Sequence, residues 1–139
     1  MEASFELFDH TADIGIRVRA AAMPGLVAPA TEGLYAVIGE VMAGDEADSV
    51  SFDLRDGAPP ELLRDYLAEL LVLFERDARR VILLDDPRFD ERGLKVTART
   101  ANVDRARSDL IREVKAVTYH ELEIRAIAGG YEATIIVDI

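Results

Sequence analysis

Apolar residues recur along the chain in two patterns, one typical of strands and one typical of helices. Alternation of apolar and polar residues predicts strands, whereas apolar residues spaced three and four apart predict helices. The predicted strands cover residues 5–7, 14–18, 50–54, 81–84, 94–98, 117–126 and 131–138. Helical spacing is found over residues 30–42 and 62–74, so two helices are expected.

The second helix has the clearer pattern, because its leucines, with Tyr66 and Phe74, form one apolar stripe. Pro59 and Pro60 suit its first turn, and Arg76 suits its carboxyl end through the helix dipole. Two helices and about seven strands, the last of them consecutive, predict an α+β fold. We expect a largely antiparallel sheet with both helices packed on one face, in a single domain of residues 1–139.

Three segments depart from these patterns. Residues 102–113 are polar and irregular and predict a long surface loop, and residues 85–90 predict a shorter one. Within residues 117–126 the apolar positions change from odd to even numbers, so we expect one long strand with a β-bulge near His120.

Composition narrows the classes of function. The chain has 16 basic and 27 acidic residues, a net charge of -11, which opposes attraction to phosphate and argues against tight direct binding to nucleic acid. Without cysteine there can be no disulfide, zinc finger or thiolate nucleophile. No apolar run approaches the roughly 18 residues of a membrane helix, and no secretory signal is recognisable. We therefore expect a cytoplasmic protein that does not contact a membrane.

Acidic groups at the two ends of the sequence suggest a cation site. Asp138 and Ile139 follow the apolar run 135–137, so a chain that stops there places a side-chain carboxylate beside a terminal carboxyl group. Asp13 lies between two predicted strands near the start. If Asp13 meets the terminus, three anionic groups converge, and a cation or a positively charged partner would stabilise them. Alternatively, Asp13 caps a turn through local backbone hydrogen bonds.

Three short motifs resemble the signatures of the archease family. They are His-Thr-Ala-Asp-Ile-Gly at 10–15, Val-Lys-Ala-Val-Thr-Tyr-His at 114–120, and Ile-Val-Asp-Ile at 136–139. The resemblance implies a non-catalytic accessory protein of the RNA ligase that joins 3'-phosphate and 5'-hydroxyl ends in tRNA splicing and RNA repair. It implies promotion of guanylylation and multiple turnover of that ligase, and a bound divalent metal, usually calcium, with magnesium or manganese possible.

Residue by residue, the resemblance implies a metal site made of Asp13, Asp138 and the carboxyl group of Ile139. Oxygen ligands of this kind suit hard cations. Lys115, His10 and His120 are candidates for contact with the ligase, although both histidines also suit structural roles. The sequence departs from the family at 102–107, ahead of the second motif, and at Tyr131, where tryptophan is common.

Two other functions compete with the activator. A small metal-dependent hydrolase would hold its metal with Asp13 and Asp138 and use His10 or His120 as a base. A chaperone-like binding protein would need an exposed apolar patch. The absence of a nucleophile motif and of a nucleotide-binding loop favours the activator.

Overall fold

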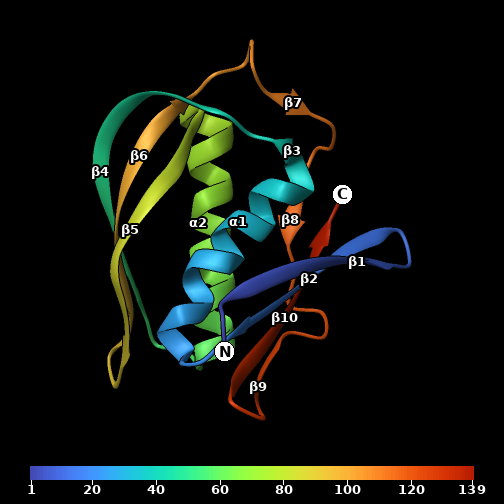
Figure 1. Cartoon of the computed structure of the whole chain (residues 1–139), viewed down its shortest axis with the longest axis vertical. Coiled ribbons are helices and arrows are strands. Elements are labelled where there is room, and N and C mark those ends of the chain that lie inside the picture. Colours follow the sequence, from blue (N-terminus) through green and yellow to red (C-terminus); the bar gives the residue numbers. More distant parts are fainter.

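Two helices lie between two antiparallel sheets in the computed structural model, which describes residues 1–139 (Figure 1). The five-stranded sheet contains β1 (Ser4–His10), β2 (Asp13–Ala20), β8 (Ala116–Val117), β9 (Glu123–Ile127) and β10 (Gly130–Asp138). The three-stranded sheet contains β4 (Ala43–Arg55), β5 (Arg79–Asp90) and β6 (Gly93–Val103). A small third sheet pairs β3 (Gly39–Glu40) with β7 (Asp109–Leu110).

Each helix packs mainly against a different sheet. A 3-10 turn (Met23–Leu26) leads into α1 (Val27–Ile38), which lies on β1 and β2, whereas α2 (Pro59–Asp77) lies on the three-stranded sheet and on β8. The predicted leucine stripe of α2 is buried, and Pro59 opens the helix as expected. The core is one cluster of 27 buried residues drawn from both helices and both larger sheets.

Alternation along β2 and β10 decides which side chains reach the candidate site. On β2, Ile14, Ile16 and Val18 are buried toward the helices, and Ile135 and Val137 do the same on β10. Because successive side chains point to opposite faces of a sheet, Asp13 and Asp138 lie on the outer face, away from the helices.

The α+β class and the largely antiparallel pairing are confirmed, but the strands number ten and form three sheets. The predicted loop at 85–90 is wrong, because β5 continues to Asp90 through a bulge that contains Asp86 and Pro87. Proline is tolerated there, since a bulged residue need not donate to the ladder. β4 begins before the predicted strand 50–54, at Ala43, and passes through the acidic segment 45–48 with two register shifts on an edge strand.

Two further predictions need correction. The first helix ends at Ile38 and does not reach residue 42, because Gly39 adopts a φ of 145°. The continuous strand over 117–126 is also wrong: β8 ends at Val117, a turn follows, and β9 begins at Glu123. Glu121 has a left-handed backbone with a φ of 50°, which lies outside the range of a regular strand. The change of the apolar positions from odd to even numbers therefore marks a break between two strands. Of the predicted loop 102–113, residues 104–108 and 111–113 are surface segments outside the strands, whereas residues 102–103 end β6 and residues 109–110 form β7.

Neither helix combines the length and the apolar character needed to span a lipid bilayer.

Candidate functional site

The antiparallel pairing of β2 with β10 brings Asp13 and Asp138 directly opposite each other. Side chains of directly opposed residues share one face, with their Cβ atoms about 4.5–5.5 Å apart. Both aspartates are partly exposed at the end of the sheet. The two acidic groups predicted to meet therefore do meet, although they lie 125 positions apart in the sequence.

Neither carboxylate is neutralised by the protein. No hydrogen bond or ion pair involves the side chain of Asp13 or Asp138, so Asp13 does not cap a turn. Like charges directly opposite each other on a sheet are destabilising. Two adjacent carboxylates without a basic partner are a donor set that fits a hard divalent cation such as calcium or magnesium.

The end of β10 is held in place by packing and by a backbone contact. Ile139 is half-buried, and its side chain packs against the hydrophobic core. The backbone N–H of Lys115 donates to the carbonyl oxygen of Asp138 at 2.8 Å. The second sequence motif is thereby fixed beside the third. Lys115 itself is exposed, and its ammonium group forms no ion pair with the aspartates.

A row of directly opposed residues crosses the outer face of the sheet. It joins the predicted metal ligands to the residues predicted to contact the ligase. His10 lies opposite Asp13 in the β1–β2 pair, Asp13 lies opposite Asp138, and Asp138 lies opposite Ala116 of β8. The predicted ligand-type residues Asp13 and Asp138 are therefore flanked by His10 on one side and by the Lys115 segment on the other.

His10 and His120 also come together, with a residue that the sequence did not single out. His10 Nε2 lies 3.1 Å from Glu121 Oε2, and the two imidazole rings are 5.3 Å apart at 68°. His10 Nδ1 is buried and has no hydrogen-bond partner. The sequence does contain a signal for Glu121. The apolar positions change from odd to even numbers after residue 119, and this change marks the turn in which Glu121 lies.

The segment that carries His120 is anchored to the sheet and to α2. Thr118 donates to the carbonyl oxygen of Ile136 from its backbone N–H at 3.0 Å and from Oγ1 at 2.8 Å. Arg64 of α2 donates to the carbonyl oxygen of Val117 at 2.9 Å, and its guanidinium lies 4.3 Å from the ring centre of Tyr119. The start of the turn is thus fixed by contacts on both sides.

Farther along the same outer face, the carboxylate of Glu132 has basic partners, unlike those of Asp13 and Asp138. Arg125 Nη2 and Arg19 Nε donate to Glu132 at 2.7 Å and 2.8 Å, and the Glu132 side chain is 5% exposed. Hydrogen bonds from Arg125 lower the pKa of Glu132, Arg19 adds to this effect, and burial opposes it. Glu132 therefore has two basic partners, whereas Asp13 and Asp138 have none.

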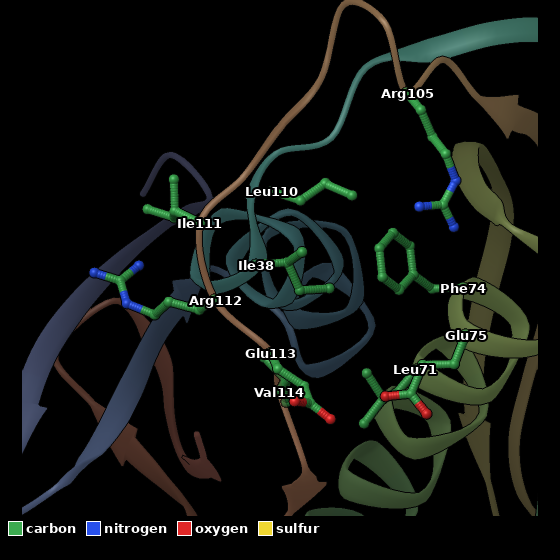
Figure 2. A pocket seen from close by; sticks show the side chains of 10 residues that line it. All are labelled: Ile38, Leu71, Phe74, Glu75, Arg105, Leu110, Ile111, Arg112, Glu113 and Val114. Carbon is green, nitrogen blue, oxygen red and sulfur yellow. The ribbon is translucent and has the colours of Figure 1, made fainter.

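A pocket of about 460 Å³ lies away from these residues, between α2 and the segment 110–114 (Figure 2). Ile38, Leu71, Phe74 and Leu110 line it, and Ile111 at its edge is 59% exposed. None of the predicted site residues lines this pocket.

Comparison with known proteins identifies the relatives of this chain. The model of the Archease protein family (MTH1598/TM1083) matches residues 5–139. The chain is 33% identical to the Protein archease of Methanosarcina barkeri, over 97% of this chain and 95% of that protein. It is 32% identical to the Protein archease of Methanopyrus kandleri, over 97% and 99% respectively.

Solved structures show the same fold. The solution structure of Methanobacterium thermoautotrophicum protein 1598 matches with a TM-score of 0.73 and 26% identity, covering 98% of this chain and 99% of that one. A crystal structure described as an archease, possible chaperone, from Thermotoga maritima matches with a TM-score of 0.69 over 96% of both chains. At 20% identity the second likeness concerns the fold alone. The family model and the curated relatives together show that the chain belongs to the archease family.

Proposed function

We propose that the protein is a metal-binding accessory protein that activates an RNA ligase of the type joining 3'-phosphate and 5'-hydroxyl ends. Family membership supports the role, and one observation carries its chemistry: Asp13 lies directly opposite Asp138, and neither carboxylate has a basic partner. The role is that of an activator in tRNA splicing or RNA repair, which promotes guanylylation and repeated turnover of the ligase.

The proposed ligands are the carboxylates of Asp13 and Asp138 and the carboxyl group of Ile139, which follows Asp138 directly. Calcium is the expected ion, and magnesium or manganese would accept the same oxygen donors. When bound, the ion supplies a positive charge that offsets the repulsion between the carboxylates and can attract an anionic group of the partner. Both aspartates stay partly exposed, so a partner can approach the ion.

The proposed contact surface consists of the row His10, Asp13 and Asp138 with the neighbouring residues Lys115 and His120. The net charge of -11 suits a ligase surface that is basic because it binds RNA, since complementary charge steers association. Exposed Lys115 sits at the edge of this surface and is available to an acidic group of the ligase or to an RNA phosphate.

The proposal is tested with the RNA ligase encoded in the same genome. Guanylylation of the ligase and joining of a 3'-phosphate RNA are followed with substrate in excess, with and without this protein. We expect repeated turnover only when the protein is present. Equal turnover with and without the protein would contradict the proposal.

One observation supports the hydrolase alternative: His10 and His120 lie together beside the aspartate pair. A base next to a metal could activate water. The two functions differ in what the protein does alone: a hydrolase releases phosphate or cleaves an ester without any ligase. Incubation of the isolated protein with 2',3'-cyclic phosphate RNA and with general phosphoesters, in calcium or manganese, is expected to give no product.

The chaperone-like alternative rests on the pocket shown in Figure 2, which six apolar and four charged residues line, with exposed Ile111 at its edge. An archease structure has been described as that of a possible chaperone. A general chaperone would suppress aggregation of unrelated unfolded proteins, whereas a dedicated activator would not. Light scattering of heated citrate synthase with and without this protein distinguishes the two.

A further inference from the structure

Three side chains of the types that commonly ligate metals meet outside the aspartate pair. The ligand atoms of His10, His120 and Glu121 all lie within 4.8 Å of one another. The shortest separation, 3.1 Å, joins His10 Nε2 to Glu121 Oε2. Asp13 and Asp138 are not members of this cluster. It therefore offers nitrogen-rich ligation next to a site whose proposed ligands are oxygen only.

The backbone places the cluster from two distant parts of the chain. His10 ends β1, opposite Asp13, while His120 and Glu121 lie in the turn between β8 and β9. The backbone N–H of His120 donates to Thr118 Oγ1 at 3.2 Å, and Leu122 N–H donates to the carbonyl oxygen of Tyr119 at 3.4 Å. Glu121 has a φ of 50°, a conformation that disfavours most side chains yet turns this one toward His10.

We propose that His10, His120 and Glu121 form a second metal site, which selects a borderline transition ion such as zinc, cobalt or nickel. Neutral imidazole nitrogens suit these ions, whereas calcium and magnesium prefer oxygen. In a tetrahedral site with bonds of about 2.0–2.1 Å, neighbouring donor atoms lie about 3.3 Å apart. The 3.1 Å pair already fits, and small side-chain rotations close the remaining separations.

The exposure of the cluster suits an ion with free coordination positions. The side chains of His10 and Glu121 are 23% and 56% exposed, and His120 is exposed. Three protein ligands on one side leave a position for water or for an atom from a docked partner. His10 Nδ1 has no hydrogen-bond partner to orient the ring. We therefore expect an affinity about 10- to 100-fold below that of sites in which this nitrogen is hydrogen-bonded.

The composition of the chain makes this site easy to test. His10 and His120 are the only two histidines, and there is no cysteine. Ligation of a transition ion by nitrogen side chains can come from this cluster alone, provided that the protein carries no histidine tag. Cobalt is the probe, because its visible absorption reports both binding and coordination by nitrogen and oxygen.

Tag-free protein is titrated with cobalt chloride, and the His120→Gln and Glu121→Gln variants are compared with Glu123→Gln. Glu123 is an exposed acidic residue two positions along, so its variant loses the same charge without touching the cluster. We expect cobalt to bind the wild type and Glu123→Gln alike. His120→Gln and Glu121→Gln each lose a ligand, so they should bind cobalt more weakly by at least the roughly 10-fold that loss of an outer-shell partner costs. Zinc should compete with cobalt.

Calcium binding separates this site from the aspartate site and verifies folding. His120→Gln should bind calcium as the wild type does, and Asp13→Asn should retain cobalt binding. Absence of cobalt absorption from the wild type would overturn the proposal. So would cobalt binding that survives His120→Gln and disappears in Asp13→Asn, since the ion would then belong to the aspartates. Neither result depends on the ligase.

Discussion

Asp13 lies directly across from Asp138 in the antiparallel pairing of β2 with β10. This relationship depends on the register of the two strands, because a shift of one residue would move one carboxylate to the face that packs against the helices. The buried residues Ile14 and Val137, opposed in the next row, fix that register. The hydrophobic core thus determines that two like charges meet at the end of the sheet.

Replacing Asp13 with asparagine should abolish calcium binding without damaging the fold. Without metal, Asp13→Asn should be more stable than the wild type by about 0.2–1 kcal/mol, because the opposed like charges are gone. Calcium should stabilise only the wild type, by about 2.7 kcal/mol at 100 times its Kd. Thermal melting in chelator and in calcium measures both effects.

Asp9→Asn is the matched control for this variant. Asp9 is also exposed and acidic, but it lies opposite Ile14 and thus on the other face of the sheet. Its melting temperature should respond to calcium as that of the wild type does. A calcium response that persists in Asp13→Asn would remove Asp13 from the site.

An extension after Ile139 should weaken calcium binding. Even one added residue converts the carboxyl group of Ile139 into a neutral amide and moves the new charge about 3.3–3.6 Å along the chain. A tag ahead of Met1 leaves this group unchanged and serves as the control. Calcium titration of the two tagged forms makes the comparison, and equal affinities would show that Asp13 and Asp138 act without the carboxyl group of Ile139.

Glu132→Gln should destabilise the protein at neutral pH by about 1–2 kcal/mol, because three charge-assisted hydrogen bonds from two arginines to a buried carboxylate are weakened. The lowered pKa of Glu132 means that its contribution is complete above the ordinary pKa of 4.5 and is lost as pH falls through the folded-state value. Denaturant unfolding at several pH values should show the difference shrinking in acid. The exposed Glu6, which pairs with Arg17, is the control, and Glu6→Gln should change stability by less than about 1 kcal/mol.

Tyr35→Phe should cost about 1–3 kcal/mol, because the Tyr35 hydroxyl accepts a hydrogen bond from the buried backbone N–H of Val81 at 2.8 Å. Burial raises the pKa of Tyr35 to about 12. Its contribution is therefore complete below pH 10 and is lost as pH rises toward 12. Tyr131→Phe is the control, since no hydrogen bond involves the Tyr131 hydroxyl. Similar losses in both variants would contradict the assigned role of the Val81 contact.

Local patterns predicted the parts of the fold that depend on local physics. The alternation around Ile16 and the leucine stripe before Phe74 both identified elements that the structure contains. Pro87 and its charged neighbours are typical of a loop, so the sequence predicts a loop over residues 85–90. Only the pairing partner β6 reveals that they form a bulged edge strand. Strand pairing is a long-range property, which periodicity does not report.

For the candidate site too, local sequence predicts some features and strand pairing determines the others. The sequence placed Asp13 and Asp138 at the ends of strands, but their direct opposition follows from strand register. Glu121 was missed because its meeting with His10 requires a turn in place of a continuous strand. A break in the strand and a β-bulge both shift the apolar positions from odd to even numbers. The sequence pattern alone therefore does not distinguish them.

Turnover of the RNA ligase with Asp138→Asn tests the central claim most directly. Ligase, excess 3'-phosphate RNA and calcium are combined with wild-type protein, Asp138→Asn or Asp9→Asn, after melting curves have shown that all three are folded. We predict many products per ligase molecule with the wild type and with Asp9→Asn, and about one with Asp138→Asn. A folded Asp138→Asn protein that supports wild-type turnover would contradict the proposal that the opposed aspartates hold the metal needed for activation.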